Sequence, residues 1–362
     1  MFKTRRCLLS SGLKLAAGAA FSPALLTRAN AAPEQALKSS AKPCGWQVGL
    51  AVDNAKLQNP QYAQAVTANF NLVTLSGMKW DRLHPQSQKF DFSEADAGMQ
   101  FAVAHGIRVH GHNLCWNNPQ AYPAWFKTEM NKSNAEKYLV SHINTVAGRY
   151  KGKIDSWDVV NEAVVGWSKE KGFLYPGIWL SMLGPQYIDI AFHAAEQADP
   201  AALRVLNIYH VEQDTQDSLD TRRGILELLQ QLVSRKVPIQ AVGIESHLDA
   251  MQPLGGPTFR EFLHGIHSLG LQIMITELDV TESRVTGSSI DWDRKVAQYY
   301  GDYLDSVLPY CNARRAIFWA LQDRWESNRR VQGLLQANFS TRLNFGVAAT
   351  ALEQKTACER VG

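Results

Sequence analysis

Short apolar runs alternate with longer amphipathic segments along most of the chain. Each run is rich in Val, Ile, Leu or Trp and is too short for a typical helix, which is typical of a strand buried on both faces. Eight such runs predict strands at 46–52, 71–75, 107–115, 154–161, 203–209, 241–248, 272–280 and 314–321. The intervening segments show helical periodicity and predict helices at 60–68, 93–105, 134–150, 185–198, 218–235, 258–269, 292–308 and 344–356.

The strict alternation of strands and helices favours a parallel sheet, because parallel neighbours need a crossover connection. Eight such units favour closure of the sheet into a single (β/α)8 TIM barrel of the α/β class. A length of 362 residues suits one barrel, and we find no internal repeat or low-complexity linker that indicates an appended domain. We therefore predict one barrel over residues 44–362.

The first 31 residues have the composition of an export signal. They contain five basic residues and no acidic residue, an apolar run at 15–26 that is too short to span a bilayer, and small residues at the end. The Arg5-Arg6 pair in TRRCLL favours the twin-arginine type over an ordinary Sec signal. We predict a signal peptide over 1–31, a polar spacer over 32–43 and a periplasmic or secreted mature protein, whose measured mass would locate the cleavage site.

Removal of this signal changes the formal charge of the chain from +3 to −2, since it carries five positive charges. A nearly neutral domain without runs of Lys or Arg gives no electrostatic basis for binding nucleic acid or an anionic membrane surface. We therefore expect a monomer that binds neither nucleic acid nor membrane and has no membrane span.

Four cysteines remain beyond the signal, and their spacing shows no metal-binding motif. They are Cys44, Cys115, Cys311 and Cys358. Because the first and last strands of a closed barrel are neighbours, we expect Cys44, Cys311 and Cys358 to lie near one another at its bottom. Export permits oxidation, but the pairing stays open.

Two of the apolar runs end in a carboxylate. Glu162 follows KIDSWDVVN, and Glu277 lies near the end of QIMITELDV. A carboxylate in this position is costly unless a partner compensates for its burial. Catalytic residues of TIM barrels lie at the C-terminal ends of the strands, so we expect both groups in one mouth. Two facing carboxylates are the working groups of a glycosidase.

The other predicted strand ends carry imidazoles, amides, further charged groups and flat aromatic rings. The candidate residues are Lys79, His112, Trp116, Asn161, Glu245, His247, Asp279, Trp319 and Trp325. Polar groups of these types bind sugar hydroxyls, and indole rings cover the apolar faces of the sugar. The combination predicts a polysaccharide or oligosaccharide substrate and no cofactor.

At these residues the sequence resembles glycoside hydrolase family 10, the endo-β-1,4-xylanases, from about residue 45 to residue 352. The motifs are MKW at 78–80, GHNLCW at 111–116, WDVVNEA at 157–163, GIESHL at 243–248, ITELD at 275–279 and FWAL at 318–321, with Asp323 after it. Each motif alone is a weak signal. Together they stand at successive predicted strand ends in the order of the family.

The resemblance implies retaining hydrolysis of internal β-1,4-xylosidic bonds in xylan by double displacement. Glu162 would be the acid/base and Glu277 the nucleophile. His247 and Asp279 would orient the nucleophile and support its charge. The remaining candidates would bind substrate: Lys79, His112 and Asn161 through hydroxyls of the sugar that is cleaved, Trp116 and Trp319 as walls of that subsite, and Glu245 and Trp325 nearby.

The chain departs from the family pattern mainly where the retained sugars would bind. Leu75-Ser76-Gly77 stands where Glu-Asn is usual, Asn117 replaces a common His, Ile208 a common Asp and Glu245 the usual Gln. We expect an unchanged catalytic core with altered glycone subsites. The alternatives are therefore a glycosidase acting on another β-linked glycan, or a carbohydrate-binding protein without turnover.

Two groups of residues have a second interpretation. His110 and His112 resemble the HxH pair of metal-dependent amidohydrolases, but no further ligands follow at the expected strands, so we expect no metal. Trp167, Tyr175 and Trp179 form either a platform for leaving-side sugars or packing under a long loop. Glu245, beside Glu277 and His247, is expected to be protonated or to hold a cation or a substrate hydroxyl.

Overall fold

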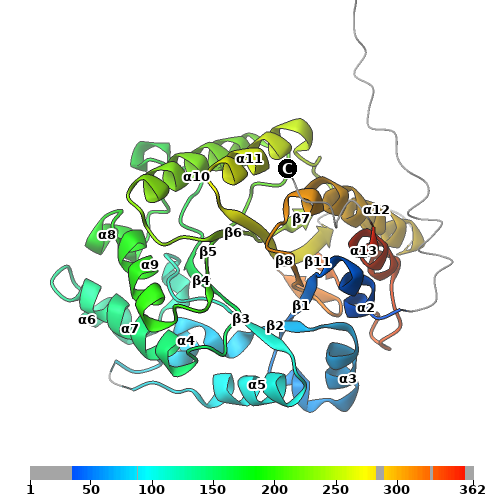
Figure 1. Ribbon diagram of the computed structural model, residues 1–362, viewed down its shortest axis with the longest axis horizontal. Coiled ribbons are helices and arrows are strands. Elements are labelled where there is room, and N and C mark those ends of the chain that lie inside the picture. The colour runs from blue at the N-terminus through cyan, green and yellow to red at the C-terminus, as the bar shows by residue number, and fades with distance from the viewer. Residues whose placement is uncertain (1–34, 88, 283–288, 327–328, 355–362) are drawn as a thin grey trace, which may run out of the picture.

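The structure is a computed structural model that describes residues 35–87, 89–282, 289–326 and 329–354. Eight parallel strands form a closed barrel surrounded by helices (Figure 1). The strands are β1 Gln47–Val52, β2 Leu72–Leu75, β3 Arg108–Gly111, β4 Ser156–Asn161, β5 Leu203–Ile208, β6 Ala241–Ile244, β8 Gln272–Glu282 and β9 Arg315–Phe318. Pairing of β9 with both β1 and β8 closes the barrel. The predicted TIM barrel is therefore confirmed.

Eight helices that follow the strands form the outer layer, and each matches a predicted helix to within three residues at either end. They are α3 Pro60–Asn69, α5 Ser93–Ala104, α7 Ala135–Arg149, α9 Tyr187–Ala198, α10 Gln216–Ser234, α11 Gly256–Ser268, α12 Ser289–Val307 and α13 Leu343–Glu353. Two of them, α3 and α10, have a side-chain cap at the first turn. Asn59 accepts two backbone amides at the start of α3, and Thr215 accepts the amide of Ser218 at the start of α10.

Shorter helices occupy the connections. The α-helical ones are α2 Leu37–Ala41, α4 Trp80–Leu83, α6 Ala124–Glu129 and α8 Ile178–Leu183. The 3-10 helices are η1 Lys42–Cys44, η2 Lys56–Gln58, η3 Ser76–Met78, η4 Pro119–Ala121, η5 Lys169–Lys171 and η6 Leu308–Tyr310. No helix in the described part of the chain is long and apolar enough to cross a membrane.

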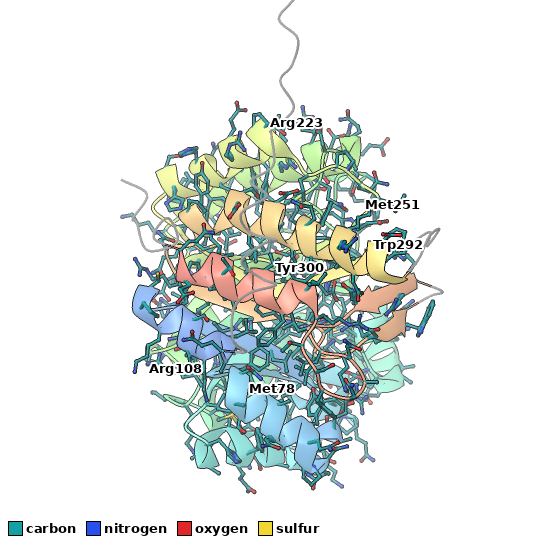
Figure 2. The ribbon with its side chains drawn as sticks, turned by 90° about the vertical axis from the view of Figure 1, so that its right-hand side faces the viewer. Met78, Arg108, Arg223, Met251, Trp292 and Tyr300 are labelled. Atoms are coloured by element: carbon teal, nitrogen blue, oxygen red, sulfur yellow. The ribbon has the colours of Figure 1, made fainter. Side chains whose placement is uncertain are left out.

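Side chains fill both the barrel and the layer between the barrel and its helices (Figure 2). Inside the barrel, apolar side chains from strands on opposite sides form one small cluster: Leu72, Val205, Ala241, Met274, Ala313 and Ile317. Outside it, Tyr300 of α12 is 1% exposed and stacks on Phe318 of β9, with 6.4 Å between the ring centroids. The last residue of β3 is Gly111. A larger residue would not fit there, because a Cβ would lie 2.0 Å from the ring of Trp157.

The segment predicted as a polar spacer is partly folded. Within 32–43, residues Leu37–Ala41 form α2, which packs against α13 and buries Leu37 and Ala41 completely. A five-residue helix with three buried positions gives no periodic signal, so the sequence did not indicate it. Cys44 follows this helix and is disulfide-bonded, whereas Cys115 and Cys311 are buried free thiols. Cys358 and the predicted signal peptide lie outside the described residues.

Three short strands extend the sheet beyond the barrel and were not predicted as separate elements. β7 His247–Asp249 follows β6 and pairs with the second half of β8. β10 Arg324–Glu326 and β11 Arg329–Gln332 form an antiparallel hairpin that pairs with the end of β8. This extension begins beside Glu277 and Asp279, so it borders the barrel mouth.

Candidate active site

The two predicted catalytic carboxylates lie at the barrel mouth. Glu277 is on β8 and is 4% exposed, and Glu162 follows β4 directly. Glu162 has a φ of 52°, and His210 and Ser246, after β5 and β6, have φ values of 57° and 67°. A non-glycine residue in this left-handed region costs about 1 to 3 kcal/mol. Three neighbouring strand ends therefore hold strained backbone at the place where catalysis is expected.

His247 joins Glu277 to Asp279, as predicted. Its Nε2 donates to Glu277 Oε2 at 3.1 Å and its Nδ1 donates to Asp279 Oδ1 at 2.8 Å. Arg324 Nη2 donates to the other oxygen of Asp279 at 2.8 Å. Burial alone would lower the pKa of His247. Its contacts with Asp279 and Glu277 instead raise this pKa well above the usual value. The two carboxylates therefore favour the charged form of the imidazole.

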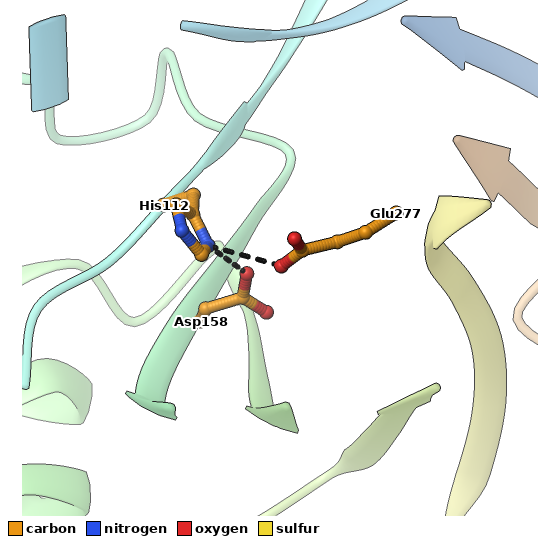
Figure 3. A group of neighbouring side chains, drawn as sticks. All are labelled: His112, Asp158 and Glu277. Carbon is orange, nitrogen blue, oxygen red and sulfur yellow. Dashed lines mark hydrogen bonds and ion pairs between the residues drawn. The ribbon is translucent and has the colours of Figure 1, made fainter. Parts of the chain in front are cut away.

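A second histidine approaches Glu277 from β3 (Figure 3). His112 Nδ1 lies 2.9 Å from Asp158 Oδ2 and 3.6 Å from Glu277 Oε1. Burial alone would raise the pKa of Glu277, but His112 and His247 lower it. Burial would also raise the pKa of Asp158, but His110 and His112 lower it. Glu277 is thus held in its ionised form at neutral pH.

His112, Asp158 and Glu277 are also close enough together for one cation to contact all three. Within this set, His112 Nδ1 is at hydrogen-bond distance from Asp158 Oδ2 and makes a longer contact with Glu277 Oε1. His110 is completely buried, with Nε2 2.8 Å from Asp158 Oδ2 and Nδ1 2.7 Å from Ser156 Oγ. The HxH pair therefore binds one carboxylate from two sides.

Glu162 lies in an environment that favours its protonated form. Burial, together with the charge of Glu277, raises its pKa to about 7, against the opposing effects of Trp116, His247 and Lys79. Asn161 Nδ2 donates to Glu162 Oε1 at 3.3 Å. At neutral pH the mouth therefore holds one carboxyl group that retains a proton for part of the time and one that is ionised.

Aromatic rings and polar groups continue the mouth into a cleft. Trp319 is half-buried and meets the rings of His112 and His247 edge to face, at centroid distances of 5.5 and 6.1 Å. Lys79 Nζ lies 5.6 Å from the ring of Trp116. One arm of the cleft is lined by Lys79, His112 and Trp319 with Asp53, Lys56, Leu75, Ser76 and Gln322. The other arm is lined by His247 and Trp319 with His210, Gln213, Asp217, Asp249 and Gln252.

The departures from the family pattern at Leu75 and Ser76 border the first arm. Leu75 is completely buried, and Ser76 Oγ donates to Glu94 Oε1 at 3.0 Å. A Cβ at Gly77 would lie 2.9 Å from the Glu94 side chain. Leu75 thus packs in the core, Ser76 binds Glu94, and Gly77 leaves room for the Glu94 side chain.

The structure does not bring Trp325 to the other candidates. Its side chain is 72% exposed on β10 and lines neither arm of the cleft. Successive side chains of a strand point to opposite faces, and the preceding Arg324 is directed to Asp279. Trp325 therefore lies outside both arms of the cleft, and its contact with substrate stays a prediction.

Three residues of the mouth were missed, and two of them gave a weak signal. Asp158 lies in the middle of the apolar strand WDVVN, where the argument used for Glu162 applies equally. Asn207 is a polar residue in the apolar run of β5, and its Nδ2 approaches Asn161, Glu245 and Glu277. Arg324, on the unpredicted hairpin, gave no signal at all.

Comparisons with known proteins identify the family of the chain. The sequence model of glycosyl hydrolase family 10 matches residues 36–345. Endo-1,4-beta-xylanase B of Thermotoga neapolitana is 31% identical over 77% of this chain and 78% of its own length. Exoglucanase XynX of Acetivibrio thermocellus is 29% identical over 76% of this chain and 26% of its own length. Xylanase 10B from Thermotoga petrophila RKU-1, solved with xylobiose, is 29% identical with a TM-score of 0.78, over 90% of this chain and 99% of that one. The chain therefore belongs to glycosyl hydrolase family 10, and it is a glycoside hydrolase.

Proposed function

We propose that the protein is a retaining endo-1,4-β-xylanase with Glu277 as nucleophile and Glu162 as acid/base. The observation that carries this proposal is the opposite perturbation of the two carboxyl groups. Two histidines lower the pKa of Glu277, while burial raises that of Glu162 to about 7. A double displacement needs one ionised and one protonated carboxyl group at the scissile bond.

In the first step Glu277 attacks the anomeric carbon while Glu162 gives its proton to the departing oxygen. The product is a glycosyl ester on Glu277, which carries no charge. The repulsion that helps to keep Glu162 protonated is then removed. Glu162 can therefore accept a proton from the water that attacks the ester, which regenerates both groups.

We expect net retention at the anomeric carbon, because two successive inversions restore the configuration. Proton NMR of the first minutes of hydrolysis of a β-linked xylo-oligosaccharide should show the β-anomer as the initial product. If the α-anomer appeared first, a water would be attacking directly and Glu277 would act as a base, as in inverting enzymes.

Another β-linked glycan is the second candidate substrate. It is favoured by the altered residues at 75–77 and by the relative whose name describes an exoglucanase. Release of reducing ends from xylan, β-glucan, mannan and galactan decides between the substrates. Turnover of any of them separates an enzyme from a binding protein that has lost catalysis.

Aromatic residues after Glu162 support a leaving-side subsite for long chains. The segments 163–165 and 173–175 pair as a hairpin, with Tyr175 N donating to Ala163 O at 2.9 Å. Trp167 lies at its tip, is 64% exposed, and meets the Tyr175 ring at a centroid distance of 6.2 Å. It lies no more than about 17 Å from Glu162 along the chain. Trp179, by contrast, is fully buried and is a packing residue.

We expect Trp167→Ala to lower kcat/KM on xylohexaose about three- to tenfold, since one aromatic stacking contact would be lost. The matched control is Trp325→Ala, which removes an exposed tryptophan outside the cleft. Neither variant should alter turnover of an aryl xylobioside, which has no leaving-side sugar. Equal losses on both substrates would identify Trp167 as structural, and no loss on either would show that it binds no sugar.

A further inference from the structure

The side-chain amide of Asn207 has fewer N–H hydrogens than there are acceptor oxygens around it. Its Oδ1 accepts from Thr276 Oγ1 at 2.6 Å, which fixes the orientation of the amide. Its Nδ2 lies 2.8 Å from Asn161 Oδ1, 2.9 Å from Glu277 Oε1 and 3.1 Å from Glu245 Oε1. An amide nitrogen carries two hydrogens, so it cannot serve three acceptors at once. One of these oxygens needs a proton from another source.

Of the three acceptors, Glu245 has the longest hydrogen bond to Asn207 and no close cationic partner in the described part of the chain. Its contact with Asn207 is the longest of the three, and the residue is 3% exposed. The nearest cation is His247, whose Nε2 is 3.9 Å from Glu245 Oε2 but 3.1 Å from Glu277 Oε2. No Lys or Arg forms an ion pair with Glu245 within the residues that the structure describes. An ionised Glu245 would therefore be a poorly compensated buried charge.

The surroundings of Glu245 are themselves acidic. Glu277 faces it from β8, Glu162 from the end of β4 and Glu212 from the segment after β5. One oxygen each of Glu245 and Glu277 and a nitrogen of His247 lie within 4.8 Å of one another. Burial, followed by the charges of Glu277 and Glu162, raises the pKa of Glu245 well above its usual value, and only His247 opposes the shift.

We propose that Glu245 keeps its proton in the active enzyme, so that Glu245 and Glu277 form a dyad that carries a single negative charge. The inference rests on the proposed function, since it assigns that charge to the nucleophile. A neutral Glu245 no longer depends on the shared hydrogens of Asn207 to compensate a buried charge, and its proton removes the repulsion between two adjacent buried carboxylates. Glu245 is then a positioning residue for Glu277.

The charge belongs to Glu277 because the two histidines lie closer to that residue. His247 and His112 approach Glu277 at 3.1 and 3.6 Å, whereas the contact of Glu245 with His247 is longer, at 3.9 Å. Formation of the glycosyl ester neutralises Glu277. We therefore expect the pKa of Glu245 to fall in the intermediate, since the largest charge that opposes its ionisation has gone.

Carbon-13 NMR of protein labelled at the glutamate carboxyl carbon tests the protonation state directly. Glu245→Gln identifies the resonance of Glu245 by its loss. We expect this resonance at the position of a protonated acid at pH 7 in the wild type, and ionisation at lower pH in Glu277→Gln, where the neighbouring charge is absent. A Glu245 resonance at the ionised position at pH 7, or one unaffected by Glu277→Gln, would overturn the proposal.

The pH dependence of kcat/KM gives an independent test. The alkaline limb near pH 7 reports loss of the Glu162 proton. If Glu245 is neutral, Glu245→Gln leaves the charge near Glu162 unchanged, and the midpoint of the limb should move by less than about 0.3 pH unit. If Glu245 is ionised, the variant removes a negative charge and the midpoint should fall by about one pH unit. Lys79→Met, which removes a positive charge that acts on Glu162, should raise it and thus calibrate the response.

The two proposals fail in different ways. A wild-type protein that hydrolyses no β-1,4-xyloside contradicts the proposed function, and the NMR titration still reports the dyad. A wild-type xylanase whose Glu245 is ionised at pH 7 retains the proposed function and loses the dyad.

Discussion

Glu277→Gln should lower xylan hydrolysis by about 10⁴-fold or more and leave the barrel folded, because a nucleophile is lost with almost no change in volume. The amide cannot form a stable glycosyl ester. Most of the surroundings of residue 277 should persist, since Asn207 Nδ2 can still donate to an amide oxygen, as it does to the carboxylate at 2.9 Å. Initial rates on an aryl xylobioside and on xylan measure the effect, and circular dichroism and the thermal midpoint report the fold.

The matched control is Glu261→Gln, the same chemical change at an exposed position of α11. This variant should retain wild-type rates. The inactive Glu277→Gln protein should still bind xylohexaose in calorimetry. Turnover above one tenth of wild type by a folded Glu277→Gln protein would remove Glu277 from the role of nucleophile.

Glu162→Ala should give a loss that depends on the leaving group. Substrates that need a proton on the departing oxygen should lose about 10²- to 10⁴-fold, whereas a dinitrophenyl xylobioside should still form the glycosyl-enzyme rapidly. The alkaline limb near pH 7 should disappear with the activated substrate, because the group whose pKa burial raises to about 7 is absent. The second step should be slow, since no base is present to activate water.

Azide separates this role from simple structural damage. A small anion can enter the space of the missing carboxylate and attack the ester without a base. Added azide should therefore restore turnover of the activated substrate and give a β-xylosyl azide. If all leaving groups suffered equally and azide had no effect, the acid/base would be another residue.

The barrel could be predicted almost completely from the sequence because its strands are buried on both faces. Each strand is a short apolar run, and each outer helix has a sustained apolar face, so burial leaves a readable pattern. Elements that depend on tertiary contacts give no such pattern in the sequence. α2 has two buried apolar residues, and β10 and β11 are rich in Arg and are held by pairing with β8 and by ion pairs such as Arg330–Asp323 at 2.5 Å.

The site was predictable to the extent that position along a strand decides it. Glu162, Glu277, His247 and Asp279 stand at strand ends, and a closed barrel brings strand ends together. The direction of Trp325 depends on a hairpin that no local pattern indicates. The acceptors around the Asn207 amide come from the ends of several strands. Their number can be counted only when the registers of these strands are known.

The packing of α2 against α13 has a consequence for how the enzyme can be attached to something else. α2 leads into the N-terminal end of β1, which lies opposite the barrel mouth, and α13, which follows the β10–β11 hairpin, packs against α2. A fusion partner, a solid support or a surface anchor joined beyond either helix would therefore leave the substrate path open. Because the two helices touch, a short linker between the ends would also permit new termini elsewhere in the barrel. Immobilised or circularly permuted forms should accordingly accept long polymer chains as freely as the original protein does.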